Sequence, residues 1–436
     1  MIKQLRVHDN KRYLMTGDGE PFFYLADTAW ELFHKLSLDE TGYYLDIRQA
    51  QGFNVVQAAA LAEDDGLRRP NAYGRVPLHK TEGLEDPKRP DLTGPYSYWE
   101  HMDRVIKEAE KRGIYIALLP TWGDKFYPGQ GKGPKIFTPE NAGRYGEWIG
   151  RRYREQKNII WMLGGDRPLE TVEHEAVVDA MAEGIRHGDG GEHLMTFHPY
   201  GGTSSADYVG GKEYIDFHTV QSGHTMGSYE SYLLLKRTRE AQEKPFLDAE
   251  PRYEDHPACF TTKYGYNWNE TDLRQNTYWA LMEGVCGNTY GNHCVWYMNR
   301  EKGEYFQYEW KEALDHPGAW QARYAKQLRE SRDYFSFRPA TELVEEEEAV
   351  MGRVAAGRGD HYAYCYSPLG LPMRVHVERF SGEPVAASWF NPRNGHEEVI
   401  SVVPGKETLF VPPTSGKGCD WVLVLEHPDQ RKTAEV

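Results

Sequence analysis

Acidic, histidine and tryptophan side chains recur where short β-rich segments of the sequence end. One such segment leads into Trp122 and Asp124, and the next leads into Asp166 and Arg167. The whole set comprises Asp27, Trp30, Trp122, Asp124, Asp166, Arg167, His198, His224, Glu250, Arg252, Tyr253, Asn292, His293 and Trp296. Because basic residues do not cluster in it, the set suits a neutral polyhydroxylated ligand better than a phosphate or a nucleotide. We therefore predict that these residues surround a small carbohydrate.

Two carboxylates of this set, Asp166 and Glu250, follow the fourth and the seventh β-rich segment. Hydrolysis of a glycosidic bond needs two carboxyl groups, one protonated to assist the leaving group and one ionised to attack or to activate water. In a closed eight-stranded barrel the fourth and seventh strands lie on opposing sides, so the two carboxylates can face each other. This placement predicts that Asp166 and Glu250 are a catalytic pair.

Each carboxylate also has a structural interpretation. Asp166 could cap a helix or pair with Arg167, and Glu250 could form an ion pair with Arg252. The same loop offers further candidates that lie beyond the strand end and are aimed less directly: Glu254, Asp255 and His256. A barrel that binds carbohydrate without catalysis would keep the aromatic residues as well, and it is the alternative to an enzyme.

A metal-dependent hydrolase is a second alternative, because some barrels assemble metal sites from histidines and carboxylates. The candidate ligands are Asp27, His198, His224 and His293. No His-x-His pair follows the first strand, and single histidines on separate strands are more often hydrogen-bond donors. We therefore expect neither a metal nor any other cofactor.

Apolar β-rich segments alternate with helical patterns up to about residue 330, as in parallel βα units. We predict eight strands, over residues 21–26, 53–60, 114–120, 158–164, 194–197, 217–221, 245–248 and 287–290. The helices between them are predicted over residues 38–51, 98–112, 139–156, 171–187, 229–242 and 271–286, with a last one over 317–332. Eight units favour a closed (β/α)₈ TIM barrel, since an open doubly wound sheet would carry a Gly-rich phosphate loop after its first strand.

Beyond residue 338 the helical pattern stops and short alternating segments follow. They cover residues 349–355, 361–366, 373–377, 386–390, 399–403, 409–411 and 421–425, separated by turn-rich stretches. This pattern predicts a small all-β antiparallel sandwich. We accordingly expect a barrel domain over residues 1–338 and a β-sandwich over residues 339–436.

Composition narrows the class of partner. The net charge of −15 argues against nucleic acid and anionic membranes, which bind basic patches. The N-terminus lacks an apolar signal segment, which predicts a cytoplasmic protein. The five cysteines are scattered without a C-x-x-C pair and are expected to be reduced thiols. A homo-oligomer is compatible with the composition, and the expected partner is a small-molecule carbohydrate substrate.

Several motifs resemble the apiosidase-like glycoside hydrolases, family 140 and its relatives. They are residues 23–33 (FYLADTAWELF), 52–57 (GFNVVQ), 161–168 (WMLGGDRP), 250–254 (EPRYE) and 289–293 (TYGNH). The tail, with residues 389–393 (WFNPR) and 420–424 (DWVLV), is similar to the small β-sandwich of such proteins that is labelled a collagen-binding domain. We expect a cap or an oligomer contact from this sandwich rather than collagen binding.

The resemblance implies a role for each carboxylate. Carried over by position, it makes Asp166 the general acid/base and Glu250 the nucleophile of a retaining hydrolase. Many retaining barrel glycosidases have Asn-Glu at the first of these positions, where this chain has Gly165-Asp166. The apiosidase-like group shares the Gly-Gly-Asp form. The resemblance offers apiose as the sugar, in a plant-derived glycoside or oligosaccharide.

Overall fold

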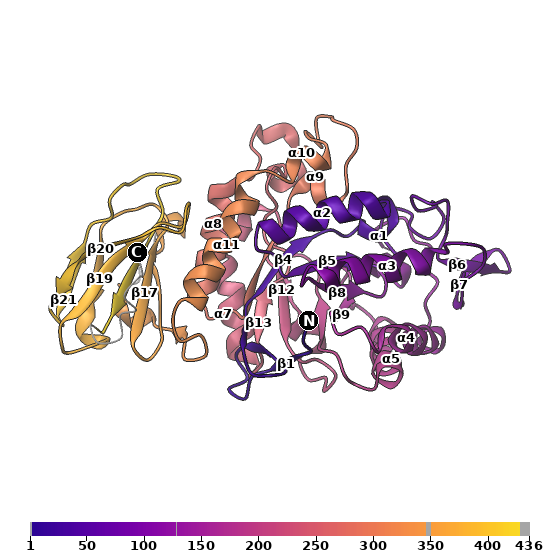
Figure 1. Ribbon diagram of the computed structural model, residues 1–436, viewed down its shortest axis with the longest axis horizontal. Helices are drawn as coiled ribbons and strands as arrows, with labels where there is room; N and C mark the ends of the chain where they lie inside the picture. Colours follow the sequence, from indigo (N-terminus) through magenta and orange to yellow (C-terminus); the bar gives the residue numbers. More distant parts are fainter. Residues whose placement is uncertain (1, 128, 346–349, 428–436) are drawn as a thin grey trace.

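The computed structural model of the protein describes residues 2–127, 129–345 and 350–427. Its main feature is a set of parallel strands, most of them buried along their whole length (Figure 1). Six pair in the order β10-β9-β8-β5-β4-β14, and β12 pairs with β13. Their bounds are β4 (Tyr24–Thr28), β5 (Val55–Ala59), β8 (Tyr115–Leu119), β9 (Ile159–Gly164), β10 (Met195–His198), β12 (His218–Gln221), β13 (Phe246–Asp248) and β14 (Gly287–Tyr290).

Hydrogen bonds close the two parallel sheets into one barrel. Between β10 and β12, the backbone N–H of Asp216 donates to the carbonyl of Met195 at 2.8 Å. Between β13 and β14, the N–H of Cys286 donates to the carbonyl of Phe246 at 2.9 Å. The eight predicted strands are thus all present, and the predicted (β/α)₈ barrel is confirmed.

Helices surround the barrel, and local sequence explains where they begin. Ser37 and Thr138 accept hydrogen bonds from the third residues of α2 and α4, as N-cap residues do. No helix of the described residues is long and apolar enough to cross a membrane. The helices are α1 (Leu32–Lys35), α2 (Leu38–Ala50), α3 (Tyr98–Lys111), α4 (Pro139–Tyr153), α5 (Val172–Asp189), α6 (Ser205–Val209), α7 (Ser231–Ala241), α8 (Glu270–Met282), α9 (His293–Trp296), α10 (Trp310–Ala313) and α11 (Pro317–Glu330).

Besides the short helices α1, α6, α9 and α10, three β-structures of the barrel domain were not predicted. A small antiparallel sheet of β1 (Leu5–Val7), β2 (Leu14–Thr16) and β3 (Pro21–Phe22) precedes the barrel, so the first predicted strand is split into β3 and β4. A hairpin of β6 (Leu78–Thr81) and β7 (Leu84–Pro90) projects beside α3 (Figure 1). The short strand β11 (Thr203–Ser204) pairs with β12.

The C-terminal domain is all-β and antiparallel, as predicted. Its larger sheet has the order β15-β16-β17-β22-β19-β20, and β18 pairs with β21. The strands are β15 (Arg338–Pro339), β16 (Ala355–Arg358), β17 (Tyr362–Ser367), β18 (Met373–His376), β19 (Val385–Phe390), β20 (Glu397–Val403), β21 (Glu407–Phe410) and β22 (Trp421–Glu426). The segment predicted over 349–355 begins outside the described residues, and its strand starts only at Ala355.

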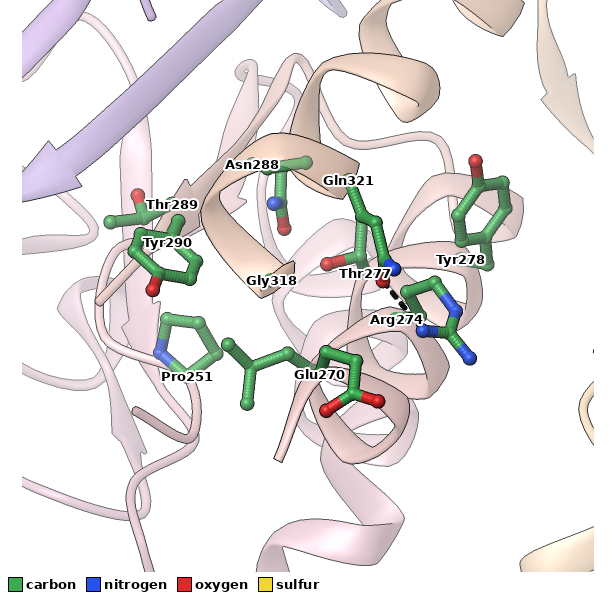
Figure 2. Close-up of a pocket in the computed structure, with 12 residues that line it drawn as sticks. Pro251, Glu270, Arg274, Thr277, Tyr278, Asn288, Thr289, Tyr290, Gly318 and Gln321 are labelled. Carbon is green, nitrogen blue, oxygen red and sulfur yellow. Dashed lines mark hydrogen bonds between the residues drawn. The ribbon is translucent and has the colours of Figure 1, made fainter. Parts of the chain in front are cut away.

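Helices α8 and α11 lie between the barrel and the C-terminal sheets (Figure 1). One apolar cluster runs from the barrel through both helices into β17 and β22. A buried ion pair joins Arg274 of α8 to Asp420 at 2.9 Å, and Arg274 also donates to Gln321 of α11 at 2.6 Å (Figure 2). The ring of Tyr278 stacks on that of Tyr366 at 5.3 Å. Beside these residues a cavity of about 20 Å³ has room for roughly one water molecule (Figure 2).

Candidate active site

A pocket of about 420 Å³ opens where the loops leave the carboxyl ends of the barrel strands. Its volume is in the range of small-molecule sites. Its described lining contains carboxylates, aromatic rings and amides but neither lysine nor arginine. The lining residues are Trp30, Glu63, Trp122, Gln130, Asp166, Tyr200, Gly201, Gly202, Gln221, Ser222, Gly223, His224, Thr225, Glu250, Tyr253, His256, Phe260, Trp296 and Tyr305.

The backbone before Asp166 turns sharply at the end of β9. Gly164, Gly165 and Asp166 all have positive φ, of 87°, 107° and 53°. A Cβ atom on Gly164 would lie 2.3 Å from the carbonyl of His198, and one on Gly165 would lie 2.6 Å from the backbone nitrogen of Gly123. Only glycine fits at these two positions, and aspartate tolerates the left-handed conformation better than most residues. The Gly-Gly-Asp motif is therefore the turn that presents the Asp166 carboxyl to the pocket.

Asp166 has surroundings that favour its protonated form. Burial in the pocket and the negative charge of Glu250 raise the pKa of Asp166 to about 7. Arg167 acts in the opposite sense, since it donates to the Asp166 carboxylate at 2.9 Å. The same guanidinium also pairs with Glu63 at 2.8 Å, so its charge is divided between two carboxylates. Asp166 can therefore hold a proton near neutral pH.

Glu250 has the opposite character. Burial would raise the pKa of Glu250, but hydrogen bonds and positive charge from His198 and His224 lower it to about 2. The Nε2 atoms of these histidines lie 3.0 and 3.1 Å from different oxygens of the carboxylate. The other nitrogen of His198, Nδ1, faces the carbonyl oxygen of Pro199 at 3.1 Å. Since both neighbours of His198 are acceptors, the imidazolium form satisfies both contacts, and Glu250 stays ionised beside it.

Aromatic rings pack around the two carboxylates. Trp30 lies 5.1 Å from Trp122 and 5.1 Å from His198, measured between ring centroids. Tyr253 is buried, and its pKa is raised well above the usual value by burial and by the charge of Glu250. Trp30, Trp122, Tyr253 and Trp296 were among the predicted substrate contacts, and all four line the pocket. Such rings offer flat apolar faces to a sugar.

Two predicted substrate-binding carboxylates lie outside the described pocket lining. Asp27 is buried in the barrel wall, where it accepts hydrogen bonds from Arg48 at 2.7 Å and from Tyr44 at 2.5 Å. It holds α2 against the barrel. Asp124 pairs with Lys125 at 2.5 Å and accepts from the backbone N–H of Gly133 at 2.9 Å. It holds the loop that carries Gln130 to the pocket, so direct contact of either carboxylate with substrate has no support in this geometry.

Arg252 and Asn292, two further predicted contacts, are also outside the described lining. Arg252 donates to the backbone carbonyl of Asp272 at 3.2 Å and lies over the ring of Trp268 at 5.0 Å. Asn292 caps α9 and donates to Asp255 at 2.6 Å. Both residues brace the loops after β13 and β14.

Three histidines pack in a row, and two of them, His224 and His256, line the pocket. His224 lies 4.3 Å from His256, and His256 lies 4.5 Å from His293, between ring centroids. Burial lowers the pKa of both His256 and His293 and keeps them uncharged. Among the described residues, no group of three or more His, Cys, Asp or Glu side chains is arranged to hold a metal ion. All five cysteines are free thiols, as predicted.

Some lining residues were missed by the sequence analysis. Glu63 follows the second barrel strand, β5, by four residues. A search for polar residues just after the end of that strand would have found it. Tyr200 lies directly after His198-Pro199, so the same search at the end of the fifth strand would have found it. Phe260 and Tyr305 lie well beyond their strands in long loops, so no local pattern indicates them.

The chain matches two family models and is similar to several solved structures. Residues 8–336 match the family model described as "Apiosidase-like, catalytic domain", and residues 339–426 match "Putative collagen-binding domain of a collagenase". A glycoside hydrolase family 5 structure from Bacteroides vulgatus is 31% identical, with 99% of this chain and 95% of that chain covered and a TM-score of 0.90. No curated protein matches the chain.

Two other solved structures extend the comparison. One, described as a glycoside hydrolase, is 29% identical over 98% of both chains, with a TM-score of 0.90. The endo-1,4-β-mannanase of Rhizomucor miehei is 12% identical, covers 76% of this chain and 100% of its own, and has a TM-score of 0.53, which shows a shared fold alone. Fold, site and neighbours thus define a glycoside hydrolase on a (β/α)₈ barrel. Within this class, the chain belongs to the apiosidase-like family.

Proposed function

We propose that this protein is a retaining glycosidase in which Asp166 is the general acid/base and Glu250 is the nucleophile. The observation that carries the proposal is the contrast between the two carboxyl groups. The pKa of Asp166 is raised to about 7 by burial and by Glu250, whereas His198 and His224 lower that of Glu250 to about 2. Two carboxyl groups with opposed pKa values in one pocket are what acid/base and nucleophile require.

In the first step a Glu250 oxygen attacks the anomeric carbon, and the bond from that carbon to the leaving oxygen breaks. Asp166 gives its proton to the leaving oxygen, so the products are a glycosyl ester on Glu250 and a free alcohol. In the second step ionised Asp166 takes a proton from water, whose oxygen attacks the anomeric carbon and releases Glu250. Formation of the ester removes the negative charge of Glu250, which lowers the pKa of Asp166 and prepares it to act as a base.

The substrate that fits this pocket is neutral and polyhydroxylated. The described lining holds three carboxylates, Glu63, Asp166 and Glu250, and neither lysine nor arginine, so an anionic sugar would be repelled. Trp30, Trp122 and other aromatic rings provide flat surfaces for sugar rings. We infer a plant-derived glycoside or oligosaccharide, with an apiose-containing one as the first candidate because of the family resemblance.

A screen of nitrophenyl glycosides and plant oligosaccharides, repeated with Glu250→Gln, tests the proposal. We expect turnover by the wild type and a loss of at least about 10⁴-fold in the variant, because the amide cannot form the ester. Glu254→Gln is a matched control, since Glu254 is a buried carboxylate outside the described lining that is bound to Tyr290 and Gly318. Retention is read from the anomer that appears first in the proton NMR spectrum.

Other outcomes identify the alternatives. Near-normal turnover by Glu250→Gln, or initial formation of the inverted anomer, would contradict the mechanism. Sugar-dependent stabilisation without any released reducing ends would indicate a carbohydrate-binding barrel. Loss of activity with a chelator, restored by a divalent metal, would indicate a metal-dependent hydrolase.

A further inference from the structure

The loop after β13 holds an aromatic ring at the mouth of the pocket in an unusual way. Phe260 lines the pocket, yet 54% of it is exposed. Cys259 and Phe260 both have positive φ, of 59° and 60°, within the short 3-10 turn Ala258–Phe260. Two successive residues other than glycine rarely adopt this conformation, and it is strained for a bulky aromatic residue. Strain combined with an exposed apolar ring at a pocket indicates a functional constraint rather than core packing.

Buried groups hold this ring in place. Its edge-to-face contacts are with His224, at 5.5 Å between centroids, and with His256, at 4.9 Å. The backbone N–H of Phe260 donates to Pro257 at 3.0 Å, and that of Cys259 donates to the carbonyl of His224 at 3.2 Å. Because His224 also binds Glu250, the position of the Phe260 ring is tied to the catalytic carboxylate.

Tyr305, from the loop after α9, is a second exposed ring on the same support. It packs edge-to-face on His293 at 4.7 Å and on His256 at 6.2 Å, and 37% of it is exposed. Phe260 and Tyr305 therefore both rest on His256, and both line the pocket. Neither lies in the inner group formed by Trp30, Trp122 and His198 around the carboxylates.

We propose that Phe260 and Tyr305 form a binding site for the second unit of the substrate, the one joined to the sugar that occupies the carboxylate pair. The unit recognised is one with a flat apolar face, either a second sugar ring or an aromatic aglycone. This inference rests on the proposed glycosidase function and makes it more specific. The substrate is then an oligosaccharide or an aryl glycoside rather than a glycoside with a small alkyl group.

The test compares ligands of different length with variants of one loop. Binding to protein carrying Glu250→Gln is measured by calorimetry for glucose, xylose, mannose, galactose, arabinose and apiose, for their methyl and phenyl glycosides, and for plant di- and trisaccharides containing them. Phe260→Ala is expected to weaken the longer or aryl ligands about tenfold and to change monosaccharide and methyl glycoside affinity less than twofold. Tyr264→Ala is the matched control, because Tyr264 is 64% exposed on the same loop but outside the described lining.

Phe260→Gly separates binding from stability. Glycine adopts positive φ without strain, so this variant should unfold at the same or a higher temperature than the parent while losing the same affinity as Phe260→Ala. Phe260→Tyr retains the ring and should retain binding. Loss for oligosaccharides alone identifies a sugar ring as the second unit, whereas loss for phenyl glycosides alone identifies an aromatic aglycone.

The outcomes distinguish this inference from the function on which it rests. If the wild type turns over a glycoside and Phe260→Ala changes the affinity for long, aryl and methyl ligands by the same factor, the second-unit site is refuted. The catalytic assignment then stands. Equal affinity of the parent for a monosaccharide and for every longer ligand would refute it too. If no ligand binds and none is hydrolysed, both proposals fail.

Discussion

Replacement of His198 by phenylalanine is predicted to move the pH profile of the enzyme. Phenylalanine keeps an aromatic ring packed against Trp30 and Trp122 but removes the donor that lies 3.0 Å from Glu250. A hydrogen bond to a charged group contributes about 1.5 to 3 kcal/mol, and one pKa unit corresponds to about 1.4 kcal/mol. The bond stabilises the ionised form, so its loss raises the pKa of Glu250 by roughly one to two units.

The profile of kcat/KM reports the free enzyme, which in the proposed mechanism must carry ionised Glu250 and protonated Asp166. In the wild type these forms coexist between pH values of about 2 and about 7. In His198→Phe the acid limb should rise to between about pH 3 and pH 4. The positive charge of His198 also lowers the pKa of Asp166, so the basic limb should move upward as well.

His224→Phe is the informative comparison. It removes the donor to the other oxygen of Glu250, at 3.1 Å, and should move mainly the acid limb. His256→Phe keeps the contact with His224 but removes no hydrogen bond to Glu250, so both limbs should stay in place. Tryptophan fluorescence at each pH verifies that the variants are folded. If His198→Phe left both limbs where the wild type has them, the assigned ionisation states would be wrong.

Two further substitutions test structural claims. Gly165→Ala should abolish most activity and lower the unfolding temperature, because its Cβ would lie 2.6 Å from the Gly123 nitrogen at a φ of 107°; an active, equally stable variant in scanning fluorimetry would contradict this. Arg274→Ala leaves Asp420 buried with the weaker partner Arg393, so the free energy of unfolding should fall by about 3 kcal/mol, as measured by urea denaturation. Arg274→Lys should lose less of the free energy of unfolding. An unchanged urea midpoint in Arg274→Ala would show that the ion pair contributes little to stability.

The regular part of this fold could be predicted from the sequence for identifiable reasons. Barrel strands are buried on both faces, so they appear as short continuous apolar runs such as Ile159–Gly164. Helix starts carry their own capping chemistry, as at Ser37. The hairpin β6–β7 was not predicted because its strands contain lysine, aspartate and proline, which are poor strand formers. Much of the hairpin is also solvent-exposed.

The search for polar residues at strand ends located the pocket but could not assign a role to each residue. It identifies residues near the carboxyl end of the barrel, but not whether a side chain points inward or into the wall. Asp27 illustrates this, since its partner Arg48 lies 21 residues away in α2 and only the folded chain brings them together. Phe260 and Tyr305 reach the pocket through long loops, whose paths depend on tertiary contacts such as those with His256.

The shared core of α8, α11 and the C-terminal sheet determines which truncations and domain exchanges this protein can tolerate. Since Tyr278 packs on Tyr366 and Arg274 pairs with Asp420, the outer face of α8 is built for a covered environment. A gene fragment ending after α11 would display an apolar surface and an arginine without its carboxylate partner Asp420, and would be expected to aggregate. A barrel without the second domain would need polar residues at these helix positions to remain soluble. Exchange of such domains between family members therefore requires both sides of the contact to be exchanged together.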